Sequence, residues 1–160
     1  MNRGPLITAI GVLVLLVGIS VYLLRSGAPT APVKTAVIPE GSSPPIGPYT
    51  PAVEVGSMLF LSGQLGIDPS TGEIVEGGTI PQARQAMANL RSLLNAAGMT
   101  FDDVVRATVY LADLDDYGAF NEEYGKYFGD VPPARVCIQV ARIPRDGRVE
   151  ISMIAVGASN

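Results

Sequence analysis

Two charged residues near the carboxyl end of the chain, Arg135 and Glu150, carry side chains suited to the chemistry of a small carboxylic acid. The planar guanidinium of arginine stays charged at any working pH and matches a carboxylate with two parallel hydrogen bonds. A glutamate carboxylate can orient a water molecule and take its proton, and such general base catalysis contributes about 10²- to 10⁴-fold. Together the two residues predict binding of a carboxylate and attack by water.

Residue types that are scarce in the sequence exclude several other mechanisms. The chain has no histidine, so imidazole bases and imidazole metal ligands are excluded. Its single cysteine, Cys137, excludes an intramolecular disulfide and a cysteine-cluster zinc site. Because no histidine could activate it, neither Cys137 nor Ser62 is predicted to be a nucleophile, and Cys137 is predicted to line a binding cleft. We expect neither a metal nor a cofactor.

The strands that carry these residues alternate between apolar and polar side chains. In the strand predicted over 134–141, Arg135 and Cys137 point away from the apolar side chains that we expect to pack under helices. The strand predicted over 149–156 places Glu150 on that same second face. Such a face is too apolar to be fully solvated and too charged to be buried without partners. We therefore expect an oligomer that covers the face and leaves clefts between its subunits.

An ion pair between Arg135 and Glu150 on a solvated sheet is the alternative interpretation. In a simple hairpin of the two strands, Glu150 would face Val140, which lies roughly 16 Å from Arg135 at about 3.3 Å per residue. A hairpin could therefore not form this pair. Either the two strands are not neighbours in the sheet, or the residues meet through another geometry.

The elements that position these side chains follow from apolar spacing and turn residues. The pattern predicts five strands, over residues 52–55, 58–64, 104–112, 134–141 and 149–156. One helix begins at Thr79, where Thr79 and Gln82 form a capping box, and Gly98 ends it. A second helix begins at Asp115 or Asp116, and its aromatic residues share one side: Tyr117, Phe120, Tyr124 and Tyr127. The order predicts an α+β fold, a mixed sheet with two helices on one face.

The amino-terminal segment accounts for much of the apolar excess of the 160-residue chain, which is 48% hydrophobic and 16% charged. Residues 6–24 form an uncharged apolar run of about the length of helix that crosses a hydrocarbon core. The run predicts a single transmembrane anchor within residues 1–25, with a signal peptide and a buried helix as alternatives. A short amino-terminal tail usually stays in the cytoplasm, so we expect a single-pass membrane protein whose domain lies on the extracytoplasmic side.

The remaining chain divides into a spacer and an acidic domain. Residues 26–45 are rich in proline and are predicted to be a semi-rigid linker, which leaves 46–160 as the folded domain. From Gly41 onward there are eight Lys or Arg residues and fourteen Asp or Glu residues, a net charge of −6. Because binding to a phosphate backbone requires a positive surface, nucleic acid is not an expected partner.

Several short motifs follow one another in a fixed order along residues 46–157. They include Ile46-Gly47-Pro48-Tyr49, Ser62-Gly63-Gln64, Ala96-Ala97-Gly98, Phe120-Asn121-Glu122-Glu123-Tyr124 and Pro133-Ala134-Arg135-Val136-Cys137. This series resembles the signature of the RidA (YjgF/L-PSP) family. The resemblance does not extend to residues 1–40.

The resemblance implies a fold, an assembly and an activity. The family fold is a chorismate-mutase-like α+β sheet, assembled as a homotrimer with a cleft between each pair of subunits. RidA-type members hydrolyse reactive 2-enamines and 2-imino acids to 2-keto acids and ammonia without a cofactor. The resemblance implies that Arg135 holds the substrate carboxylate and that Glu150 activates water. It implies substrate-binding positions at Tyr49, Ser62, Gly63, Asn121 and Cys137.

Two other functions stay open at this point. A module that binds or senses small carboxylates without turnover would use the same Arg135, since proteins of this family need not be deaminases. Endoribonuclease activity is attributed to some relatives of the family. The net charge of −6 and the missing histidine count against that activity here.

Overall fold

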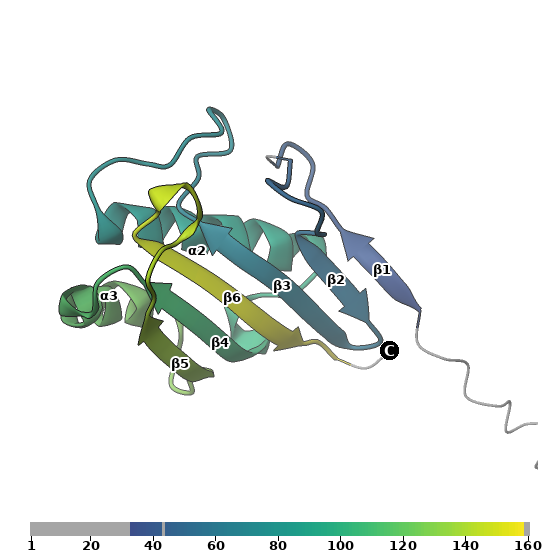
Figure 1. Ribbon diagram of the computed structural model, residues 1–160. Coiled ribbons are helices and arrows are strands. Elements are labelled where there is room, and N and C mark those ends of the chain that lie inside the picture. The colour runs from purple at the N-terminus through teal and green to yellow at the C-terminus, as the bar shows by residue number, and fades with distance from the viewer. Residues whose placement is uncertain (1–32, 43, 159–160) are drawn as a thin grey trace, which may run out of the picture. The chain divides into compact units, whose positions relative to one another are not determined.

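The computed structural model describes residues 33–42 and 44–158, which form an α+β fold. Six strands make one sheet in the order β1-β2-β3-β6-β4-β5 (Figure 1). The strands are β1 Lys34–Val37, β2 Ala52–Val55, β3 Met58–Leu65, β4 Val104–Leu111, β5 Ala134–Gln139 and β6 Val149–Val156. The helices are α2 Thr79–Ala96 and α3 Tyr117–Tyr124, and α2 lies across the rear face of the sheet in Figure 1. The predicted mixed sheet with two helices is confirmed.

The last strand of the chain, β6, lies in the middle of the sheet. It pairs antiparallel with β3 on one side and with β4 on the other, whereas β4 and β5 are parallel. Strand β4 therefore separates β5, which carries Arg135, from β6, which carries Glu150. The sequence analysis left two possibilities, that these two strands are not neighbours or that Arg135 and Glu150 meet through another geometry. The first is confirmed, because β5 and β6 are not neighbours in the sheet.

The core fills the space between the sheet and α2. Met87, Leu90 and Leu94 of α2 are almost completely buried, as is Leu59 of β3. These α2 residues recur at spacings of three and four, so that one stripe of the helix faces the sheet. Gly98 follows the helix with a φ of +69°, the left-handed conformation predicted for the residue that ends it.

The predicted capping box at the start of α2 is wrong. Gly78 occupies the N-cap position, and no side chain caps the helix. The hydroxyl of Thr79 donates a hydrogen bond to the carboxylate of Asp116, and Oε1 of Gln82 accepts one from the backbone N–H of Arg148 at 2.7 Å. Both side chains therefore link α2 to more distant segments, just before α3 and just before β6.

Strand β1 was not predicted, because it lies within the segment 26–45 interpreted as a linker. Its residues pair with β2 in antiparallel register, with Val37 opposite Ala52. Val37 is buried, whereas the other three residues of β1 are exposed. The folded sheet therefore begins at Lys34, ahead of the predicted start at residue 46.

The predicted localisation as a single-pass membrane protein is corrected. Over residues 33–42 and 44–158, no helix is both long enough and apolar enough to span a membrane. The longest described helix, α2, carries exposed charged side chains at Arg84 and Arg91. The apolar run 6–24, on which the prediction rested, lies outside the described residues.

Candidate functional site

Arg135 extends from β5 toward α3. Its Nη2 donates a hydrogen bond of 2.6 Å to Oδ1 of Asn121, and its guanidinium carbon lies 4.6 Å from the ring centroid of Tyr124. Within the described part of the chain, only Nη2 of this guanidinium has hydrogen-bond partners. The remaining N–H groups are therefore available to a carboxylate. Asn121, predicted to be a substrate-binding residue, instead accepts a hydrogen bond from Arg135.

Glu150 lies against Gly63 of β3. A Cβ built on Gly63 would overlap Oε1 of Glu150 and lie 2.8 Å from its carboxyl carbon, so only glycine leaves room for the carboxylate. The Glu150 side chain is half-buried, and this burial raises the pKa of its carboxyl above the usual value. Among the described residues it has neither a hydrogen bond nor an ion pair. This carboxylate can therefore accept a proton from a ligand or from water.

Ser62 and Tyr49 connect the segment before β2 to the Gly63 region. The Ser62 hydroxyl donates a hydrogen bond of 2.7 Å to the Thr50 carbonyl, so its role is to hold this segment against β3. Tyr49 remains 44% exposed. Tyr49 and Gly63 line the same cavity, of about 340 Å³, whose far wall includes Asn89 of α2. The structure thus brings Tyr49 and Gly63 to one cavity and places Glu150 against Gly63.

Cys137 follows Arg135 by two residues and packs against the core. Burial raises the pKa of its thiol, although the nearby Arg135 charge lowers it in part. A thiol that stays protonated is a poor nucleophile. The predicted position of Cys137 in the lining of a binding cleft stays a prediction.

The structure places Arg135 and Cys137 on the face that the helices cover, contrary to the prediction. In the parallel β4–β5 pair, Arg135 is opposite Ala107 and Cys137 is opposite Val109. Ala107 and Val109 are fully buried beneath the helices. The prediction had the correct alternation along β5 but assigned its two faces in reverse.

Glu150 lies on the opposite, open face of the sheet. It is opposite Tyr110 of β4, one residue out of phase with the buried Val149 and Ile151. Val136 and Ile138, which the prediction placed under the helices, are each 43% exposed on this open face. Within one chain, Arg135 and Glu150 therefore lie on opposite faces of the sheet.

Arg135 and Gly63 line two different cavities. Arg135 borders a cavity of about 390 Å³ lined by α3 and the segment that follows it, including Asn121, Tyr124, Phe128 and Pro133. Gly63 lines the cavity of about 340 Å³ together with Tyr49, whereas Glu150, which lies against Gly63, is not among the residues that line it. Within one chain, the free N–H groups of the Arg135 guanidinium and the Glu150 carboxylate therefore lie in different surroundings.

Several known proteins are similar to this chain. A family model described as endoribonuclease L-PSP matches residues 40–157. A mouse protein named 2-iminobutanoate/2-iminopropanoate deaminase is 51% identical over 111 residues, covering 69% of this chain and 82% of the mouse protein. This chain belongs to the RidA (L-PSP) family.

Solved structures of the RidA family share the fold. A crystal structure of a Thermotoga maritima protein is 42% identical, with a TM-score of 0.76, and covers 79% of this chain and 100% of that one. The crystal structure of E. coli TdcF with bound serine is 38% identical, with a TM-score of 0.73, and covers 78% of this chain and 99% of that one. The predicted family is thereby confirmed, together with its α+β sheet.

The aromatic surroundings of Arg135 are the part of the site that sequence reasoning missed. Tyr117, Phe120 and Tyr124 were predicted to share one side of a helix, and all three rings lie within 5.8 Å of the guanidinium carbon. The spacing gave the shared side but did not indicate which strand it would face. The sequence did contain a pattern that could have indicated this contact: a helix with aromatic residues on one side is followed directly by the strand that carries Arg135.

Proposed function

We propose that this chain hydrolyses 2-imino acids and their 2-enamine tautomers to 2-keto acids and ammonia. The observation that carries the proposal is the Glu150 carboxylate, which is half-buried against Gly63, has a raised pKa and has no partner among the described residues. A carboxylate with these properties is suited to accept a proton from water. The mouse relative, at 51% identity, carries the name of this activity.

In the proposed reaction, Arg135 binds the substrate carboxylate through the guanidinium N–H groups that Asn121 leaves free. Glu150 removes a proton from a water molecule whose oxygen attacks C2 of the imine, and the C=N double bond becomes a single bond. Protonated Glu150 gives its proton to the imine nitrogen. As the C–N bond breaks, the hydroxyl proton of the carbinolamine passes through the Glu150 carboxylate to the same nitrogen, and the C–O bond becomes the C=O bond of the keto acid. One water is consumed, and one 2-keto acid and one ammonia are released. Glu150 returns to its carboxylate form.

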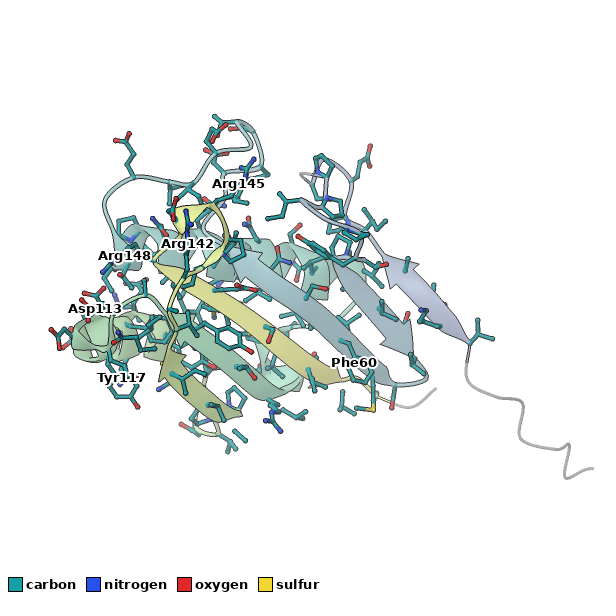
Figure 2. All side chains as sticks on the ribbon, viewed as in Figure 1. Phe60, Asp113, Tyr117, Arg142, Arg145 and Arg148 are labelled. Carbon is teal, nitrogen blue, oxygen red and sulfur yellow. The ribbon has the colours of Figure 1, made fainter. Side chains whose placement is uncertain are left out.

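The proposal requires a second copy of the chain. Because Arg135 and Glu150 lie on opposite faces of one sheet, a complete site needs Arg135 from one copy and Glu150 from another. The open face supports such an assembly, since its apolar residues are exposed in the single chain: Met58, Phe60, Val136, Ile138 and Val156. Figure 2 labels Phe60 near the lower end of β3. We propose the homotrimer that the family resemblance implies.

The test is ammonia release from 2-iminobutanoate generated in the cuvette by an amino acid oxidase. The wild-type chain is expected to accelerate release above the spontaneous rate. Arg135→Ala is expected to raise KM strongly, whereas Glu150→Gln is expected to lower kcat by about 10²- to 10⁴-fold. Unaccelerated release by the wild type, or an unchanged rate in both variants, would refute the proposal.

A small-carboxylate binding module is the second candidate function. The same free guanidinium edge of Arg135 supports it, because that edge binds a carboxylate whether or not turnover follows. Calorimetric binding of 2-oxobutanoate together with unaccelerated ammonia release would favour this function over hydrolysis.

A further inference from the structure

Tyr124 of α3 provides the nearest aromatic surface to the Arg135 guanidinium. The guanidinium carbon lies 4.6 Å from the centroid of the Tyr124 ring, compared with 5.6 Å for Phe120 and 5.8 Å for Tyr117. A cation at this distance from a ring is attracted by the negative charge of the ring face. Tyr124 and Arg135 also line the same cavity of about 390 Å³.

The ring of Tyr124, rather than its hydroxyl, makes this contact. Tyr124 is only 6% exposed, and its hydroxyl has no hydrogen-bond partner among the described residues. Burial raises the pKa of Tyr124 to about 12, so the phenol stays neutral at any working pH. A buried hydroxyl that bonds to neither Arg135 nor Asn121 adds nothing to the orientation of the guanidinium.

The Tyr124 ring contacts the face of the Arg135 guanidinium, and the Asn121 amide holds its edge. The hydrogen bond from Nη2 to Oδ1 of Asn121 is 2.6 Å long. Phe120 and Tyr124 are themselves in contact, with their ring centroids 5.5 Å apart, and both are buried. A long arginine side chain held in this way loses less conformational freedom when it binds a ligand.

We propose that Tyr124 is a positioning residue for carboxylate binding. Its ring face orients Arg135 so that the free N–H groups of the guanidinium meet a small 2-oxo or 2-imino carboxylate. The inference rests on the proposed function for the identity of the substrate. It concerns affinity for the carboxylate and not the water attack at Glu150.

The test compares Tyr124→Phe with Tyr124→Leu in the full chain. Binding of 2-oxobutanoate, a stable keto acid, is measured by calorimetry, and KM and kcat are measured with 2-iminobutanoate. Tyr124→Phe keeps the ring and is expected to bind like the wild type. Tyr124→Leu keeps apolar bulk but loses the ring, so we expect about ten-fold weaker binding and a similar rise in KM, with kcat within about two-fold of the wild type.

Tyr127→Leu is the matched control. Tyr127 lies three residues away, and its ring is 5.5 Å from the guanidinium carbon of Arg91, which the proposed site does not use. This variant removes the same chemical group from the same aromatic region and is expected to leave binding of 2-oxobutanoate unchanged. Melting temperatures of all three variants show whether each remains folded.

Three results would overturn the inference. Tyr124→Leu could bind like the wild type, Tyr124→Phe could lose as much affinity as Tyr124→Leu, or Tyr127→Leu could weaken binding equally. A wild-type chain that binds 2-oxobutanoate without releasing ammonia contradicts the proposed hydrolysis but leaves this inference to be decided by the binding data. A wild-type chain that does not bind 2-oxobutanoate contradicts both.

Discussion

Glu150 is a carboxylate whose surroundings favour its neutral form. Burial raises its pKa above 4.5, and no hydrogen bond or ion pair within the described chain opposes that shift. A general base must be deprotonated to act, so activity is lost as the pH falls through the raised pKa. We therefore expect the acid limb of kcat/KM to have its midpoint above the ordinary value of 4.5.

The measurement is kcat/KM for 2-iminobutanoate across the acid range, with spontaneous hydrolysis subtracted at each pH. Below the midpoint, the rate should fall about ten-fold per pH unit. A midpoint at or below 4.5 would show that Glu150 is not the titrating base.

Gly63 leaves the space that the Glu150 carboxylate occupies. A Cβ at position 63 would overlap Oε1 of Glu150, so Gly63→Ala must displace the proposed base. A displacement of about 1 Å costs on the order of 10²-fold in rate, and we expect a loss of that size in kcat/KM. The measurement is the same ammonia assay.

The control for this prediction is Gly118→Ala in α3. A Cβ there would meet no atom within 4 Å, so this variant is expected to retain wild-type activity. Equal activity of Gly63→Ala and the wild type would contradict the assigned contact.

The pairing of α2 with α3 depends on one buried carboxylate. Glu123 of α3 accepts hydrogen bonds from Arg84 of α2 at 2.9 Å and from Lys126 at 2.8 Å. These bonds, Arg84 first, lower the pKa of Glu123 from 4.5 to about 2. Because the pKa is lowered in the folded state, this contribution to stability is complete above about pH 4.5 and is lost as the pH falls toward 2.

Glu123→Gln is therefore expected to lower the melting temperature by about 5 °C at pH 7, because the amide cannot satisfy both cations. The difference from the wild type should shrink as the pH is lowered from 5 toward 3. Asp146→Asn removes a carboxylate from the exposed pair with Arg142 and is expected to leave the melting temperature unchanged. A constant difference for Glu123→Gln at all pH values would contradict the assignment.

Sequence patterns predicted the elements whose formation depends on local residues. The apolar stripe of α2, the alternation along β6 and the two strands predicted over 52–55 and 58–64 all correspond to observed elements. Strand β1 was missed because three of its four residues are exposed and prolines surround it. Its formation depends on pairing with β2, which a local pattern does not reveal.

The two faces of β5 show what alternation alone leaves undetermined. Period-two spacing separates Arg135 from Val136, but it does not say which of them faces the helices. Apolar Val136 and Ile138 were the natural choice for a core, yet the partly buried side chains beneath α3 are Arg135 and Cys137. If a second copy covers the open face, as we propose, apolar residues are favoured on that face as well, which accounts for Val136 and Ile138 there. The family motifs supplied the candidate site residues, and within the single chain Arg135 and Glu150 lie on opposite faces of the sheet.

At the scale of the whole molecule, the proposed divided site predicts complementation between impaired variants. At a substrate concentration near the wild-type KM, Arg135→Ala and Glu150→Gln should each have strongly reduced activity alone. In mixed assemblies, a site that takes Arg135 from one copy and Glu150 from the other is intact, and random mixing restores about a quarter of the sites. Activity is measured after the two variants are co-expressed or refolded together.

Mixing the two variants without subunit exchange is the control and should restore nothing. If the co-assembled variants regain no activity, Arg135 and Glu150 of the same copy must act together. The proposed site between copies would then be wrong.

The central place of β6 has a consequence for how the chain folds. Strand β6 is synthesised after β3 and β4, and it must enter between them. Until residues 149–156 leave the ribosome, β3 and β4 lack the partner that joins them, and the nascent sheet consists of two unconnected pieces. Contacts so distant along the chain make folding slow. Loss of β6 would therefore abolish the fold, whereas loss of an edge strand would only shorten the sheet by one strand.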